Sequence, residues 1–213
     1  YIVYGGIMGS FTLDQINEMY IDVLREIGNI GAGNATTAIA TMLNSKINMN
    51  VPKVELMDAS KLGSAICPED EIIVGIFLEV SQDITGSMMF LMKLDSAHYL
   101  ADKLMGTYKQ PDEPFDEMEL SALKEIGNII TASYLTALSN MTNLKITPSI
   151  PYVSVDMAGA ILSVPAIMFG QYGDNALLIE TEFGDDTMIN GYFILMPEQD
   201  SYATILSSLG IQM

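Results

Sequence analysis

The sequence predicts an α+β fold in which a helix–strand–helix–strand–strand–helix unit occurs twice. The pentapeptide EIGNI occurs at 26–30 and again at 125–129, and IDVLREIGNI faces LSALKEIGNI at the same offset. Further along, INMNVPKVELMD faces ITPSIPYVSVDM, with strand-like alternation in both segments. Each half alone is too small to bury a sheet well. The duplication therefore predicts pseudo-twofold symmetry and one shared, mainly antiparallel sheet that is flanked by helices.

The first repeat, about residues 12–106, is expected to begin with a long helix. The segment FTLDQINE supplies a capping residue and early acidic side chains, which favour a helix N-terminus. Alternating apolar residues then predict strands, and a run of small residues predicts a short helix between them. The expected elements are a helix (12–43), a strand (46–57), a short helix (58–66), a hairpin (72–80 with 84–93) and a closing helix (95–105).

The second repeat, about residues 116–210, is expected to follow the same order. Its opening segment FDEMELSALKE again combines a capping residue with early acids. The polar segment TYKQPDEPF (107–115) contains two prolines and predicts a linker. We expect a single domain over 12–213, preceded by a loose N-terminal arm (1–11). The expected elements of the second repeat are 116–141, 145–156, 157–169, 175–183 with 187–196, and 198–209.

The composition limits the classes of partner. The chain has 213 residues, a net charge of −18 and nine Lys plus Arg, so it repels phosphate backbones and anionic lipid head groups. Nucleic acid and membrane are therefore not expected as partners, and a protein that presents a Lys or Arg fits better. The acidity also has a simpler explanation, since it keeps a chain with 49% hydrophobic residues in solution.

Compartment and cofactors are predicted from what the sequence lacks. No apolar run approaches the ~18 residues of a membrane span, and the first ten residues lack the basic start of a signal peptide. We therefore expect the protein to reside in a reducing compartment, the cytoplasm. One cysteine, Cys67, and one histidine, His98, allow no internal disulfide and no cysteine-based metal cluster. We expect Cys67 to be a buried or half-buried structural side chain and His98 to be structural or solvated, and we expect no metal or cofactor of the chain's own.

A polar stripe follows one face of each predicted long helix. At 100° per residue, three polar positions of each repeat fall within about 60° of one another, while Leu24 and Ile27 fall on the packing side. We call each set of three a Glu–Asn stripe. The stripes are Asp22, Glu26 and Asn29 in the first repeat and Ser121, Glu125 and Asn128 in the second.

The adjacent Gly and Asn of each EIGNI segment are unfavourable in a helix interior, which requires an explanation. Gly28 and Gly127 each cost about 1 kcal/mol in a helix interior, and Asn competes for backbone hydrogen bonds. One interpretation is a solvated face whose glycines permit close helix packing. The other is a recognition surface, because Glu can pair with a cation while the Asn amide both donates and accepts. Because both repeats retain these residues, we favour the recognition surface, whose Glu and Asn side chains would insert into a site on another molecule.

The glycine-rich segment GNIGAGN also suggests a phosphate-binding loop, but this signal is weak. The segment lacks the Lys-Ser/Thr pair of a P-loop and follows no predicted strand. The second repeat reads GNIITAS, so Gly31 and Gly33 are not shared. We expect these two glycines to let the first helix bend or pack tightly.

The pattern D/S-x3-E-x2-N-x22-P resembles the signature of the CheC/CheX/FliY phosphatases of bacterial chemotaxis. The likeness extends from about residue 12 to the end of the chain. The matching positions are Asp22, Glu26, Asn29 and Pro52 in the first repeat and Ser121, Glu125, Asn128 and Pro151 in the second.

The resemblance implies hydrolysis of the aspartyl phosphate of the response regulator CheY. By this resemblance, Glu26 and Glu125 pair with a Lys of CheY, while Asn29 and Asn128 enter its active site and orient the attacking water. It also implies that Mg²⁺ belongs to CheY and that CheD is a second partner. A neutral amide suffices because phosphoryl transfer depends mainly on positioning. The alternative is a non-catalytic protein that sequesters phosphorylated CheY or CheD through the same stripes.

Overall fold

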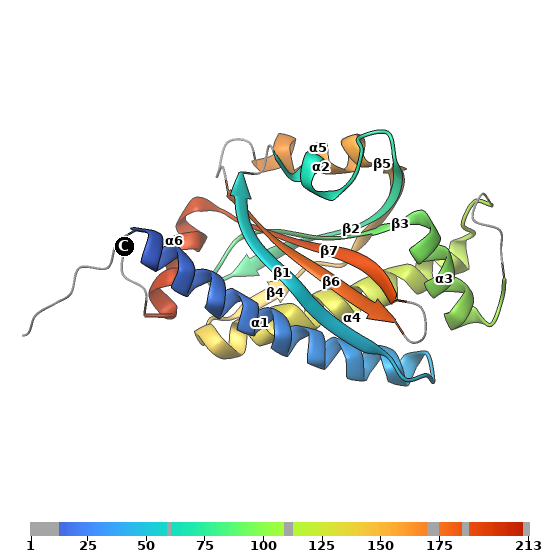
Figure 1. Cartoon of the computed structure of the whole chain (residues 1–213), viewed down its shortest axis with the longest axis horizontal. Coiled ribbons are helices and arrows are strands. Elements are labelled where there is room, and N and C mark those ends of the chain that lie inside the picture. Colours follow the sequence, from blue (N-terminus) through green and yellow to red (C-terminus); the bar gives the residue numbers. More distant parts are fainter. Residues whose placement is uncertain (1–12, 59–60, 109–112, 170–174, 185–187, 211–213) are drawn as a thin grey trace, which may run out of the picture.

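The computed structural model describes residues 13–58, 61–108, 113–169, 175–184 and 188–210 (Figure 1). The expected arm at 1–11 lies outside these residues, and the expected linker at 107–115 is described only in part. The elements in chain order are α1 (Leu13–Met42), β1 (Asn48–Asp58), α2 (Leu62–Ile66), β2 (Ile72–Gln82), β3 (Gly86–Lys93), α3 (Leu94–Met105), α4 (Glu117–Thr142), β4 (Ile146–Pro148), β5 (Tyr152–Met157), α5 (Ala158–Phe169), β6 (Asn175–Gly184), β7 (Met188–Pro197) and α6 (Gln199–Ser208).

The strands form one seven-stranded sheet whose order reflects the duplication. The order is β1-β6-β7-β3-β2-β4, and β5 also pairs with β2. All of these pairs are antiparallel. When β1, β2 and β3 are exchanged for β5, β6 and β7, the order reads the same from either edge. The expected α+β fold with pseudo-twofold symmetry is therefore confirmed.

The two repeats exchange their outer strands. The first strand of repeat one, β1, pairs with β6 of repeat two, with Val54 opposite Ile179. In turn β5 of repeat two pairs with β2 of repeat one, with Val155 opposite Val74. The hairpins β2–β3 and β6–β7 meet through β3 and β7 at the centre of the sheet. Neither repeat therefore has a complete sheet of its own.

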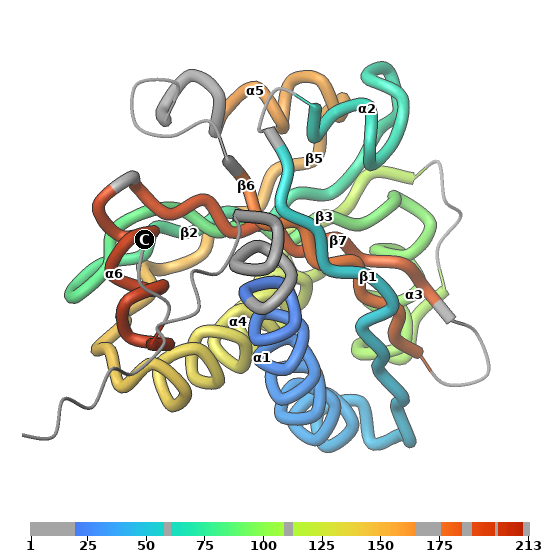
Figure 2. The backbone as a smooth tube through the Cα atoms, turned by 60° about the vertical axis from the view of Figure 1, so that its left-hand side comes forward, coloured from blue at the N-terminus to red at the C-terminus, as the bar shows by residue number. Residues whose placement is uncertain are grey.

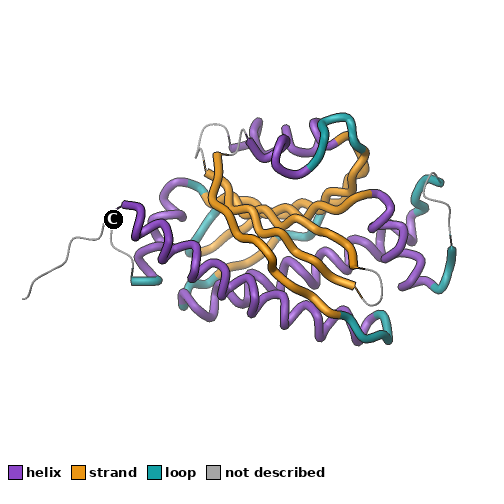
Figure 3. The backbone as a smooth tube through the Cα atoms, viewed as in Figure 1, coloured by secondary structure: helices purple, strands orange, loops and turns teal. Residues whose placement is uncertain are grey.

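Helices cover both faces of the sheet, but unequally (Figure 3). The long helices α1 and α4 lie side by side on one face, with α3 and α6 at opposite ends (Figures 1 and 2). The larger hydrophobic core lies between these helices and the sheet and includes Leu24, Ile27, Ile76 and Ile126. A smaller core lies on the other face, beneath α2 and α5. The long helices that carry the stripes thus lie on the face with the larger hydrophobic core.

The strand expected at 145–156 is wrong in one respect, because it is broken into β4 and β5. Pro148 and Pro151 lack an N–H for the ladder, so a continuous strand cannot pair through this segment. Between them the N–H of Ser149 donates to the carbonyl oxygen of Glu79 (2.9 Å), and the Glu79 N–H donates to Ser149 Oγ (3.0 Å). In β1, with Pro52 alone, the strand continues across a register shift between Asn50 and Lys53.

Local contacts confirm three smaller expectations. Asp116 caps α4, since its Oδ1 accepts hydrogen bonds from the N–H groups of Met118 (2.9 Å) and Glu119 (3.0 Å). The lone histidine, His98, is buried, and its ring stacks on Phe115 with centroids 4.0 Å apart. Cys67 is a half-buried free thiol. Histidine and cysteine thus have structural surroundings, as expected.

Candidate functional site

The Glu–Asn stripe of repeat one lies on the solvent side of α1. Asp22, Glu26 and Asn29 are all exposed. Leu24 and Ile27, on the opposite side of the helix, are 1% and 4% exposed and pack in the larger core. The helical periodicity of the sequence therefore separates a packing face from an accessible polar face, as expected.

The stripe of repeat two takes the corresponding place on α4, with one difference. Ser121 and Glu125 are exposed, but Asn128 is half-buried. Leu123 and Ile126 are fully buried beneath it. The prolines of the shared pattern also differ, because Pro52 is exposed and Pro151 is buried. The two copies thus present the same side chains in unequal surroundings.

The central glycines of the two helices differ in how closely the sheet approaches them. A Cβ on Gly127 would collide with Cδ1 of Ile76 and lie 2.8 Å from its Cγ2, so only glycine fits without a shift. A Cβ on Gly28 would meet Val51 Cγ1 at 3.4 Å, which is ordinary van der Waals contact. Close packing therefore explains Gly127 directly and Gly28 much less. Close packing against the sheet therefore requires glycine only in the second copy.

The structure separates the roles of the two unshared glycines. A Cβ on Gly31 would lie 2.9 Å from both Cα and Cγ of Tyr134, so the expected tight packing is confirmed where α1 contacts α4. Gly33 is not tightly packed, because it is exposed and has nothing within 4 Å of a Cβ position. Gly33 lies one turn beyond Asn29 on the same face. Its counterpart in the second repeat, Ala132, is also small, so no large side chain stands one turn beyond either Asn.

Charges beside the stripes were only partly anticipated from the sequence. Arg25 Nη1 lies 2.7 Å from Asp22 Oδ1, and both side chains are exposed. In the second repeat Lys124 takes the place of the Arg, and Ser121 takes the place of its carboxylate. The shared positive charge was visible in the alignment of the repeats, but the ion pair was not. Within the described residues, no cluster of His, Cys, Asp and Glu could hold a metal ion.

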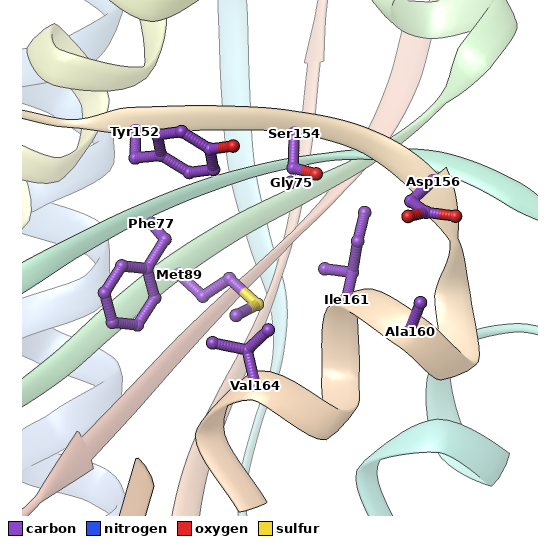
Figure 4. A pocket seen from close by; sticks show the side chains of 9 residues that line it. All are labelled: Gly75, Phe77, Met89, Tyr152, Ser154, Asp156, Ala160, Ile161 and Val164. Atoms are coloured by element: carbon purple, nitrogen blue, oxygen red, sulfur yellow. The ribbon is translucent and has the colours of Figure 1, made fainter. Parts of the chain in front are cut away.

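A cavity of about 150 Å³ lies on the other face of the sheet, between the sheet and α5 (Figure 4). Its apolar side chains face one another, and Asp156 lies at its edge. None of the stripe residues contributes to it. The candidate site is therefore an exposed helix surface that can offer a carboxylate and an amide to another molecule. The lining residues are Gly75, Phe77, Met89, Tyr152, Ser154, Asp156, Ala160, Ile161 and Val164.

Fold and site together define a class of protein that presents the same polar stripe twice on one duplicated domain. The model of the CheC-like family matches residues 19–56 and 118–155, which contain both stripes and both prolines. Over 200 residues the chain is 38% identical to the CheY-P phosphatase CheC of Bacillus subtilis (strain 168), covering 92% of this chain and 96% of that protein. The chain belongs to the CheC-like family.

Two further comparisons agree with this assignment. The flagellar motor switch phosphatase FliY of Bacillus subtilis (strain 168) is 32% identical over 144 residues, which cover 67% of this chain and 37% of FliY. The crystal structure of Thermotoga maritima FliY has the same fold, with a TM-score of 0.72 and 20% identity over 94% of this chain and 98% of that chain.

In the part of the chain that the structure describes, no helix has the length and apolar character needed to cross a membrane.

Proposed function

We propose that this chain is a phosphatase that hydrolyses the aspartyl phosphate of the response regulator CheY at two similar sites. The observation that carries the proposal is the same pair of side chains on both long helices: an exposed Glu, followed three residues later by an Asn that is exposed on α1 and half-buried on α4. Its Bacillus subtilis relative, with which it aligns over nearly the whole length, is named a CheY-P phosphatase. These features support a site that is completed by the partner protein.

In the proposed mechanism Glu26 or Glu125 pairs with a Lys of CheY and fixes the register of the complex. Asn29 or Asn128 then enters the active site of CheY, where its amide holds a water in line with the phosphorus. The water attacks phosphorus, the bond to the aspartyl oxygen breaks, and inorganic phosphate and a free carboxylate result. Mg²⁺ belongs to CheY in this scheme. Orientation by one amide contributes about tenfold to several hundredfold in rate.

The decisive experiment measures decay of the acyl phosphate on cognate CheY with Asn29→Ala, Asn128→Ala and the double variant. Each single variant should lose the share of its own site, and the double variant should give no stimulated decay. Folding should be nearly unchanged, because Ala is the better helix former. Asn34→Ala and Asn140→Ala are matched controls, since both asparagines are exposed on the same helices but lie outside the stripes.

The outcome also separates the enzyme from a sequestering protein. A folded double variant with full stimulated decay would refute the catalytic role of both asparagines. Slowed or unchanged decay with tight binding by the wild-type protein would instead indicate sequestration of phosphorylated CheY. CheD is proposed as a second partner on the family resemblance, and titration calorimetry with purified CheD tests it.

A further inference from the structure

A basic side chain lies beside the Asn of each stripe. Arg25 and Lys124 each come one residue before the Glu and four residues before the Asn. Residues four apart on a helix have Cβ atoms about 5–6 Å from each other. On the helical wheel the Asn therefore lies between the Glu on one side and the cation on the other. With only nine basic residues in a chain of net charge −18, a cation at this position in both repeats is notable.

The two copies treat this cation differently. In repeat one Arg25 Nη1 donates to Asp22 Oδ1 at 2.7 Å, so the carboxylate compensates the guanidinium. In repeat two the position of Asp22 is occupied by Ser121, which carries no charge. Among the described residues no ion pair involves Lys124. The cation is thus compensated beside Asn29 and uncompensated beside Asn128.

We propose that Arg25 and Lys124 are positioning residues that attract the anionic oxygens of the phosphorylated partner, and that residue 22 or 121 sets how strongly each does so. This inference rests on the proposed function. When the Asn reaches a phosphoryl group, the neighbouring cation comes close to the same dianion. The net negative charge of the chain otherwise repels this dianion. The Glu meets a cation of the partner at the other side of the Asn. Opposite charges on the two sides fix the orientation of the partner.

Reciprocal substitutions test this assignment, one repeat at a time. An Asn29→Ala background leaves only the second site, and an Asn128→Ala background leaves only the first. In the first background, Lys124→Gln should raise KM for phosphorylated CheY about threefold to tenfold, because it removes the cation. Ser121→Asp should raise KM by a similar factor, because the new carboxylate pairs with Lys124 and compensates its charge. In the second background, Asp22→Ser should lower KM about threefold by releasing Arg25, and Arg25→Gln should cancel this gain.

The readout is the rate of acyl-phosphate decay against CheY concentration at several salt concentrations. We expect KM to change while kcat changes less than about twofold, and we expect Lys124→Gln to flatten the rise of KM with salt. Lys124→Arg should restore the wild-type KM. Lys46→Gln and Lys145→Gln are matched controls, because these lysines are exposed, occupy equivalent positions in the two repeats and lie outside the stripes.

Each outcome bears on only one proposal. If Lys124→Gln leaves both KM and its salt dependence unchanged while the double Asn variant is inactive, the role of the cation is overturned and the phosphatase mechanism stands. An equal KM change in the Lys46→Gln and Lys145→Gln controls would also overturn it, because the effect would then reflect net charge alone. A fully active double Asn variant would instead refute the proposed function itself.

Discussion

Gly28 and Gly127 occupy identical EIGNI sequences, yet alanine at the two positions should have opposite effects on stability. A Cβ on Gly127 would collide with Cδ1 of Ile76 and lie 2.8 Å from its Cγ2 and 3.2 Å from its Cβ. Ile76 is fully buried and branched at Cβ, so these atoms cannot move independently. A Cβ on Gly28 would instead make contacts of 3.4–3.8 Å with Val51 and Ile179.

The magnitudes follow from two opposing terms. Replacing Gly by Ala in a helix interior gains about 1 kcal/mol at both positions. At position 28 no steric cost offsets this gain, so Gly28→Ala should raise the free energy of unfolding by about 0.5–1 kcal/mol. At position 127 overpacking costs about 1–3 kcal/mol, and three close atoms place it at the upper end. Gly127→Ala should therefore lower the free energy of unfolding by about 1–2 kcal/mol.

Thermal and urea unfolding of the two variants measures the difference. A gap of about 2 kcal/mol corresponds to roughly 4–8 °C in Tm for a domain of this size. In a double-mutant cycle, Ile76→Val should relieve part of the Gly127→Ala defect, because it removes the colliding Cδ1. Equal Tm values for the two Ala variants, or a Gly127→Ala variant more stable than wild type, would refute the closer approach of α4 to the sheet.

Three further predictions use other contacts. Gly31→Ala should lower the free energy of unfolding by about 1–2 kcal/mol, because the added Cβ would crowd Tyr134. At the exposed position 33, Gly33→Ala should raise it by about 0.5–1 kcal/mol. If urea unfolding finds Gly31→Ala as stable as Gly33→Ala, the contact of α1 with α4 at Gly31 is contradicted. Glu26→Gln and Glu125→Gln should weaken binding of phosphorylated CheY while saturated turnover survives better than in the Asn variants, and equal affinity by calorimetry would exclude the charge pair. Burial raises the pKa of Tyr134 to about 12, so the folded state holds this proton more tightly than the unfolded chain and stability falls as pH rises from about 10 toward 12. As pH rises from 8 to 11, the free energy of unfolding measured with urea should therefore fall less for Tyr134→Phe than for the wild-type protein. Equal falls in the two proteins would contradict this.

The duplication made most of the architecture predictable. Two copies of one pattern gave two independent views of each element, so helices and hairpins could be placed by comparing the repeats. The partners of the strands were not predictable in detail, because the exchange of β1 and β5 depends on contacts between residues 75 or more positions apart, from Phe77 with Tyr152 to Asn48 with Gly184. The break between β4 and β5 could have been inferred from Pro148 and Pro151, which together leave no continuous row of N–H donors.

The candidate site was predictable as a pattern but not as an environment. Helical spacing alone placed Glu26 and Asn29 on a face opposite Leu24, and the structure agrees. Sequence could not show that Asn128 is half-buried, because this depends on neighbours from other parts of the chain. It also could not distinguish Gly31 from Gly33, which differ only in whether Tyr134 lies opposite.

The exchange of outer strands has a consequence for the origin and the integrity of the domain. A chain that carried only one repeat would have an edge strand with no hairpin of its own to join, and it could complete this sheet only as an obligate dimer. The fusion of two copies makes that association intramolecular and removes its dependence on protein concentration. Cleavage of the chain between the repeats should accordingly yield two fragments that stay associated through four β ladders, rather than two separate folded units.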